Sequence, residues 1–337
     1  MTYEQIIKKI INGLTGNTSK DIKYLQEQMK YYKNHSMSQE ILRACGRIMY
    51  DLLPEDKKSE MGHIIDNELK VIEATLDEIR YNIYKKDIAK AINLSEALMK
   101  KADKEIMFQN DNVSEYFTFN EFFEEALYIY HNKPKRKIRA ATIPFSSIYF
   151  QHGNLLFEQK KYEEARLVLE KAMRWNPINS DILFEHMETF KVTGDIEKFA
   201  ELTRKAFQYV FKPRDIARCY RNMGYYFIEK KKYKVATACY FMSLGFEEEN
   251  KAAQSELYYI YTKTSKEFCE PTFDEVKMYG EKYDFPIGGS DDVISLALSY
   301  GEHFLDSGQI EGAIYCLEIV YNLTHNDKIK NLIEELK

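Results

Sequence analysis

The sequence predicts an all-α protein, a right-handed α-solenoid of repeated helix pairs with an irregular helical region before them. Three observations lead to this prediction. The 337 residues include only 7 prolines and 14 glycines, which is few for a β protein of this length. Apolar residues recur at helical spacing, as in Ile6, Ile7, Ile10, Ile11 and Leu14. The third observation is a repeated pattern of small residues in the C-terminal half.

In this pattern, a glycine is followed twelve residues later by an alanine, in the segments 146–177, 217–246 and 294–321. The pairs are Gly153 with Ala165, Gly224 with Ala236, and Gly301 with Ala313. Two packed helices can approach closely only where their side chains are small. We therefore expect each glycine to lie opposite its alanine where two antiparallel helices cross.

Three positions before each alanine stands a large residue that is expected to pack at the turn between the helices. These residues are Tyr162, Tyr233 and Ile310. The combination resembles the tetratricopeptide repeat, in which aromatic, glycine, alanine and proline residues recur at fixed places. The best matches are Tyr149, Gly153, Tyr162, Ala165, Ala172 and Pro177, and then Tyr220, Gly224, Phe227, Tyr233 and Ala236. The resemblance implies stacked helix pairs whose first helices line a concave surface.

The spacing of the three glycines leaves room for two further repeats. Gly153 and Gly224 are 71 residues apart, and Gly224 and Gly301 are 77 apart, so each interval holds one more unit. The segments 180–207 and 251–283 fill these intervals. Residues 146–337 are therefore expected to contain five tetratricopeptide-like repeats, to about residue 326, and then a polar capping helix over 327–337.

The N-terminal 145 residues are expected to be helical but irregular. The predicted helices span residues 3–14, 20–33, 38–53, 64–84, 87–104 and 119–131. Residues 1–60 are interpreted as a helical bundle or cap, and residues 61–145 as degenerate helical repeats followed by a basic joint.

The basic joint lies in residues 131–144, between Pro134 and Pro144. It contains Lys133, Lys135, Arg136, Lys137 and Arg139. Such a run is either a solvated loop or a contact for nucleic acid or phosphate. The net charge of −5 favours the loop, because general nucleic-acid binding needs a basic face.

The cysteines and the N-terminal segment also indicate the cellular compartment that we expect for this protein. The five cysteines, Cys45, Cys219, Cys239, Cys269 and Cys316, show no zinc or redox spacing, which favours a reducing compartment. The N-terminus predicts an amphipathic helix rather than a signal peptide, and no run of 18 apolar residues occurs. We expect a cytoplasmic protein with no membrane association.

Catalytic and cofactor motifs are absent from the sequence. His152 and His186 lie 34 residues apart, in equivalent repeat slots, and are interpreted as packed side chains rather than as metal ligands. Gly288 and Gly289 are interpreted as a turn, because no phosphate-loop Lys-Ser/Thr follows. Cys239 and Cys316 are expected to be small buried residues. No catalysis, cofactor, metal or small-molecule substrate is therefore expected, and an enzyme is the least favoured class.

The expected binding surface is a stripe along the first helices, on the concave face. Its residues share one helical face and recur from unit to unit. They are Phe150, Asn154, Phe184, Arg218, Arg221, Asn222, Tyr225 and Tyr259. Aromatic side chains on a nominally exposed face suggest that a ligand covers them. A second interpretation is that the N-terminal helices fold back and fill the groove.

Some tetratricopeptide proteins bind the C-terminal carboxylate of heat-shock chaperones through Lys, Asn and Arg at these slots. Asn154 and Arg218 match that pattern, but Phe150 and Glu185 stand where Lys and Asn are needed. The resemblance therefore implies a protein or peptide partner without naming a chaperone.

We predict a non-catalytic scaffold or adaptor that binds a protein or peptide, with nucleic acid an unlikely partner. The alternative is a receptor of the peptide-pheromone type, in which the repeats bind a short peptide and the N-terminal helices act on a regulator protein. An intact protein partner would favour the scaffold, and a copurifying short peptide would favour the receptor.

Overall fold

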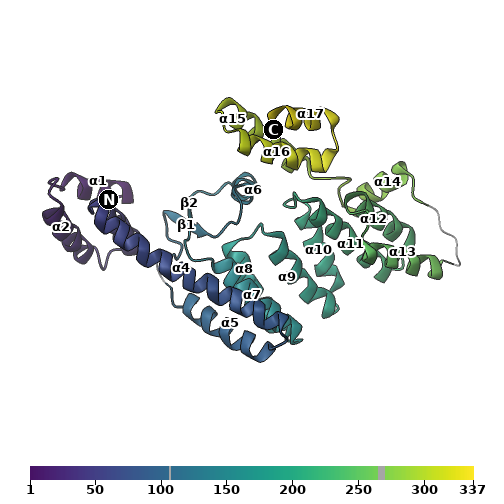
Figure 1. Cartoon of the computed structure of the whole chain (residues 1–337), viewed down its shortest axis with the longest axis horizontal. Coiled ribbons are helices and arrows are strands. Elements are labelled where there is room, and N and C mark those ends of the chain that lie inside the picture. The colour runs from purple at the N-terminus through teal and green to yellow at the C-terminus, as the bar shows by residue number, and fades with distance from the viewer. Residues whose placement is uncertain (106–107, 265–269) are drawn as a thin grey trace. The chain divides into compact units, whose positions relative to one another are not determined.

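The structure is a computed structural model that describes residues 1–105, 108–264 and 270–337. Within these ranges the chain forms seventeen α-helices and two four-residue strands (Figure 1). The predicted all-α repeat fold is confirmed. One feature departs from the all-α prediction, because the two strands pair as a small sheet.

The elements before the repeats are α1 (Tyr3–Asn12), α2 (Thr18–Tyr31), α3 (Ser38–Asp51), α4 (Glu55–Tyr84), α5 (Ile88–Ala102), β1 (Ser114–Phe117), α6 (Phe122–Asn132) and β2 (Lys137–Ala140). The repeat helices are α7 (Phe145–Glu158), α8 (Tyr162–Trp175), α9 (Ser180–Val192), α10 (Ile196–Ala206), α11 (Pro213–Glu229), α12 (Tyr233–Phe246), α13 (Lys251–Lys263), α14 (Phe273–Tyr283), α15 (Asp291–Asp306) and α16 (Ile310–Thr324). The last helix, α17 (Asp327–Leu336), packs on α16 at the expected place of the capping helix.

The chain divides into two compact units. Unit 1 comprises Met1–Thr118, Lys133–Gln159 and Arg174–Asn176. Unit 2 comprises Phe119–Asn132, Lys160–Met173 and Pro177–Lys337.

The turns between paired helices repeat one backbone geometry. A residue with positive φ stands two positions before the second helix at Lys86, Lys160, Gly194, Lys231 and Gly308. Glycine adopts this conformation without strain. Lysine is strained there because its Cβ is crowded, and the packing of the helix pair must compensate for this strain. The α4–α5 pair therefore turns in the same way as four pairs of the repeat array.

Unit 1 begins with a small bundle of α1, α2 and α3. Its core contains Ile6, Ile10, Leu25, Ile41 and Cys45, all fully buried. Burial raises the pKa of the Cys45 thiol to about 11, so this cysteine is a packed apolar residue rather than a nucleophile.

The helix α4 is longer than predicted, because it begins at Glu55 instead of residue 64. Pro54 precedes its first residue, and Glu55 and Asp56 occupy its first turn. Carboxylates there interact favourably with the positive end of the helix dipole, which supports the earlier start. In unit 1, α4 packs against α5, and α5 packs against α7 (Figure 1).

The basic joint is partly a strand, so its interpretation as a loop is wrong for Lys137–Ala140. β2 pairs in parallel with β1, in a register that sets Ser114 beside Lys137 and Phe117 beside Ala140. Two of the five basic residues are anchored and are not simply solvated. Arg136 pairs with Glu115, and Arg139 Nε donates a 3.0 Å hydrogen bond to Ser114 Oγ. These contacts tie the strand to its neighbour.

Unit 2 includes α6, although α6 precedes the repeats in sequence. Phe123 is fully buried, with its ring centre 5.1 Å from that of Phe211, two residues before α11. The neighbouring ring of Phe122 lies 5.2 Å from Tyr315 on α16. Glu121, just before α6, accepts hydrogen bonds from Lys212 and from Tyr315. The helix thus joins the core that α10, α11 and α16 share.

At the two predicted helix crossings in unit 2, the alanines are not the closest neighbours of the glycines. A Cβ built on Gly224 would lie 2.7 Å from the ring of Tyr240, one helical turn beyond Ala236. A Cβ on Gly301 would lie 3.5 Å from Cys316 Cβ, about one turn beyond Ala313. The predicted close approach is therefore confirmed at Gly224 but not at Gly301, where an added Cβ would make an ordinary contact. In both places the prediction was wrong about the residue nearest to the glycine.

Tyr220 on α11 fixes the loop between α14 and α15. The hydroxyl of this buried tyrosine donates to the Pro286 carbonyl at 2.8 Å and accepts from the Gly288 N–H at 2.7 Å. Gly288 has φ +90°, as the predicted turn requires.

Candidate protein-binding surface

The predicted surface residues fall on three first helices of unit 2 and on α7 of unit 1. We use the name first-helix face for those of unit 2: Phe184, Arg218, Arg221, Asn222, Tyr225 and Tyr259. On α11 the members follow one another at positions 218, 221, 222 and 225, the spacing that keeps side chains on one side of a helix.

Phe184 does not reach the surface of this face. Its ring is only 1% exposed, and the Arg218 guanidinium carbon lies 4.6 Å from the ring centre. A cation over an aromatic face is a favourable contact. Phe184 therefore belongs to the core and supports Arg218, and the expectation that it is an exposed aromatic is wrong.

Both arginines of the face already have acidic partners. Arg218 Nη2 lies 3.3 Å from Glu185 Oε1 and 3.8 Å from Glu188 Oε1. Arg221 Nη1 lies 2.7 Å from Glu247 Oε2 and 3.1 Å from Ser243 Oγ. Burial raises the pKa of Glu185 and the Arg218 charge opposes this shift. The face is thus a mixed-charge surface rather than a free cationic site.

The two tyrosines give the face its aromatic character. Tyr225 is half-buried, with Lys191 Nζ 4.7 Å from its ring centre. Tyr259 is 41% exposed, with Lys263 Nζ 5.3 Å from its ring centre. Each ring therefore still presents an edge or a face that a ligand can cover.

The two asparagines carry an unusual feature. The described residues include five buried side-chain polar atoms without a hydrogen-bond partner, and two of them are Asn154 Oδ1 and Asn222 Nδ2. Asn222 is only 6% exposed. A buried donor without a partner costs about 1–3 kcal/mol, so each such group calls for an explanation, such as a bound water or a ligand. Asn154 lies on α7 in unit 1, beside the half-buried Phe150.

The histidines in equivalent slots have separate partners. His152 Nδ1 lies 2.8 Å from Ser95 Oγ, whereas His186 Nε2 lies 3.6 Å from Glu170 Oε1. Cys239 and Cys316 are fully buried, as predicted, and Cys269 lies outside the described residues. Within the described ranges no three His, Cys, Asp or Glu side chains gather as a metal site would require.

His186 should make the stability of unit 2 depend on pH. Burial lowers its pKa below the ordinary 6.5, and Glu170 only partly offsets this. The unfolded chain then binds more protons between the two pKa values, so stability is complete above about pH 6.5 and falls as the pH drops below it. We expect His186→Gln to reduce this loss, as measured by urea unfolding at about pH 7.5 and about pH 5.5. Identical pH dependence in both proteins would contradict this.

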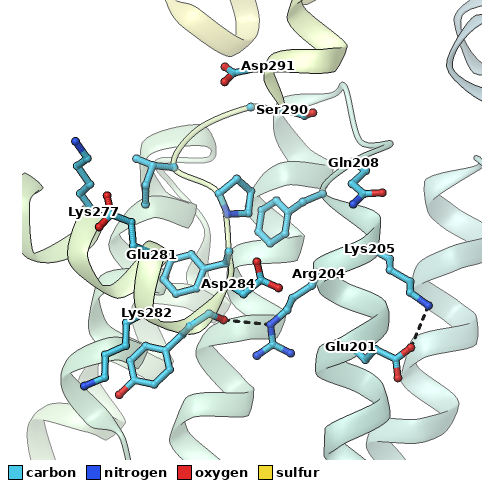
Figure 2. Close-up of a pocket in the computed structure, with 17 residues that line it drawn as sticks. Glu201, Arg204, Lys205, Gln208, Lys277, Glu281, Lys282, Asp284, Ser290 and Asp291 are labelled. Carbon is cyan, nitrogen blue, oxygen red and sulfur yellow. Dashed lines mark hydrogen bonds and ion pairs between the residues drawn. The ribbon is translucent and has the colours of Figure 1, made fainter. Parts of the chain in front are cut away.

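A pocket of about 1050 Å³ in unit 2 was not predicted (Figure 2). It lies between α10 and α14 and is closed on one side by the loop before α15. Arg204 Nε donates a 3.2 Å hydrogen bond to the Tyr283 carbonyl across it. Lys205 pairs with Glu201 at 3.0 Å on the α10 side. The lining mixes both charges with Phe207 and Phe285, and no sequence motif marks it.

None of the helices in the described ranges combines the length and the hydropathy that a bilayer span needs. The consecutive paired helices define an all-α helical repeat protein. The spacing of glycine, alanine and aromatic residues in these helix pairs resembles the tetratricopeptide repeat.

No family model matches the chain. The Hsp70-Hsp90 organising protein of Plasmodium falciparum (isolate 3D7) is 28% identical over 149 residues, which are 40% of this chain and 26% of that protein. The match thus spans about a quarter of the curated relative.

Solved structures with detectable similarity include two tetratricopeptide-repeat proteins. YrrB, described as having an unusual peptide-binding site, is 14% identical, with 64% of this chain and 98% of YrrB covered and a TM-score of 0.31. A protein from Parabacteroides merdae ATCC 43184 is 11% identical, with 99% and 96% covered and a TM-score of 0.36. These TM-scores are too low to indicate a shared overall arrangement.

Proposed function

We propose that this chain is a non-catalytic scaffold that binds a protein or an extended peptide on the first-helix face. Arg218, Arg221, Asn222, Tyr225 and Tyr259 would form the contact in unit 2. Phe150 and Asn154 would form a contact of the same kind on α7. Aromatic and arginine side chains carry much of the binding energy in protein interfaces, which supports this choice.

The observation that supports the proposal most strongly is the unpaired amide of Asn222. Its Nδ2 atom is buried without a partner, between Arg218 and Tyr225 on one stripe of α11. A peptide carbonyl could satisfy this donor when the side chain turns outward. This hydrogen bond would favour binding, because the Asn222 donor would no longer be buried without a partner.

The ion pairs of Arg218 argue against a chaperone-tail ligand. The curated relative is named as an organiser of Hsp70 and Hsp90. Here Glu185 and Glu188 already supply carboxylates to Arg218. An incoming C-terminal carboxylate would have to displace them, so we propose an internal peptide segment recognised through its main chain.

Substitution of Asn222 should weaken partner binding without lowering the stability of the protein. Asn222→Ala removes an unsatisfied donor, so the free energy of unfolding should stay constant or rise. Binding of the partner should weaken about tenfold, as expected for loss of a well-made hydrogen bond in a buried site. The partner is first isolated from host lysate by affinity purification and mass spectrometry, and its affinity is then measured by calorimetry.

Two comparisons complete this experiment. Tyr225→Ala with Tyr259→Ala should also weaken binding without unfolding the protein. Lys205→Ala, in the pocket between α10 and α14, is the control and should bind like the wild type. Wild-type affinity of both the Asn222 variant and the double tyrosine variant would refute the first-helix face as the site. A copurifying short peptide would favour a peptide receptor over a scaffold.

A further inference from the structure

The two-stranded sheet of unit 1 has two outer edges, and hydrogen bonding differs between them. In parallel pairing, alternate residues direct their N–H and C=O groups toward the partner strand, and the residues between direct theirs away. The N–H groups of Lys137 and Ala141 donate to Val113 and Phe117 on the β1 side. The main-chain groups of the alternate residues of β2, Ile138 and Ala140, therefore point away from β1.

The outer edge of β1 is fully used. Ser114 donates its N–H to Asp111 Oδ1 at 2.7 Å, and its carbonyl accepts from the Asp111 N–H at 3.0 Å. Tyr116 donates its N–H to Asn110 Oδ1 at 2.8 Å, and its carbonyl accepts from Arg174 Nη1 at 2.8 Å. Side chains and a tight turn thus close this edge against any further strand.

The outer edge of β2 is open. Ile138 and Ala140 make no outward main-chain hydrogen bond to any residue that the structure describes. Ala140 is exposed and Ile138 is half-buried. Main-chain groups are paired in most folded structure, and an unpaired strand edge can accept another strand.

The charge beside this edge favours one kind of occupant. Lys133, Lys135 and Lys137 are exposed and have no ion-pair partner in the described ranges, whereas Arg136 and Arg139 are already engaged with β1. A second copy of β2 would bring the same positive charges and be repelled. A segment rich in Asp or Glu would be attracted, and alternation would place its acidic side chains on one side of the new strand.

We propose that β2 binds an extended acidic segment of a partner protein, which adds as a third strand beside Ile138 and Ala140. Main-chain hydrogen bonds would supply the affinity, and the three lysines would select for acidic side chains. This site lies on a different element from the first-helix face, and the proposal does not depend on that face.

The test uses the full chain and a soluble probe, an acetylated peptide of about eight alternating valine and glutamate residues. Binding is followed by calorimetry at low and at high salt. We expect saturable binding that weakens with salt, together with slower hydrogen exchange at the Ile138 and Ala140 amides. Without the probe, these two amides should exchange faster than those of Lys137 and Arg139.

Two variants distinguish the contribution of main-chain hydrogen bonds to probe binding from the contribution of the lysine charges. Ile138→Pro removes the outward donor but no hydrogen bond to β1, so it should weaken probe binding about tenfold. Ile138→Val is the matched control and should bind like the wild type. Replacing the three lysines with glutamine should weaken binding and remove its salt dependence. If the proline variant loses helicity, a probe with alternate N-methylated amides replaces it and should fail to bind.

Three results would overturn the proposal. One is the absence of saturable binding by the valine–glutamate probe. Another is undiminished binding by the folded Ile138→Pro variant, or by the N-methylated probe. The last is binding of a uridine oligonucleotide in preference to the peptide, which would assign the basic residues to nucleic acid instead.

Discussion

Gly224→Leu should lower the free energy of unfolding of unit 2 by about 3 kcal/mol, at the upper end of overpacking effects. Even a single Cβ at this position would lie 2.7 Å from two atoms of the Tyr240 ring. Tyr240 is 2% exposed and cannot swing into solvent. The α11–α12 crossing must therefore open, which should appear as a lower urea midpoint and faster hydrogen exchange in both helices.

Gly301→Ala is the matched control, because Gly301 occupies the equivalent slot on α15. Its added Cβ would lie 3.5 Å from Cys316 Cβ, an ordinary van der Waals contact. Alanine is favoured over glycine in a helix by about 0.5–1 kcal/mol, so this variant should be neutral or slightly more stable. Equal destabilisation by both substitutions would refute the explanation in terms of Tyr240.

Phe123→Ala should cost about 3–5 kcal/mol, the range for truncation of a buried phenylalanine. The ring is fully buried and packs on Phe211, so its loss leaves a cavity between α6 and the repeat helices. Thermal unfolding should shift to lower temperature. Hydrogen exchange should increase in α6 and in α15, which packs against it.

The control for α6 is Tyr130→Phe on the same helix. Tyr130 is partly exposed, and its hydroxyl donates a 2.8 Å hydrogen bond to Asp292. Loss of this bond should cost at most about 1 kcal/mol. If Phe123→Ala were no more damaging than Tyr130→Phe, α6 would be a peripheral helix and not part of the core of unit 2.

The repeat helices could be predicted because their signals are local. Tyr162, Tyr233 and Ile310, expected to pack at turns, are the first residues of α8, α12 and α16. Gly224 was recognisable as a close crossing because only a small residue fits at that depth. Such features depend on neighbours within one helix pair, which the spacing along the chain fixes.

The remaining features depend on contacts that local patterns do not contain. Phe184 lies on the predicted stripe, but Arg218 of the next repeat covers its ring. β2 reads as a charged loop, and becomes a strand because β1 offers main-chain partners 23 residues earlier, at Ser114 for Lys137. The unpaired amide of Asn222 could be found only once the surroundings of every buried polar atom were known.

The place of α6 in unit 2 has a consequence for synthesis on the ribosome. Glu121 and its partner Tyr315 are 194 residues apart, so almost the whole repeat array must be translated before the contact can form. Until then Phe122 on α6 lacks its partner Tyr315 on α16. Contacts between residues this far apart in the sequence slow folding, and the exposed apolar surface makes the folding intermediate prone to aggregate. The nascent chain should therefore engage chaperones through α6 until its last helices emerge.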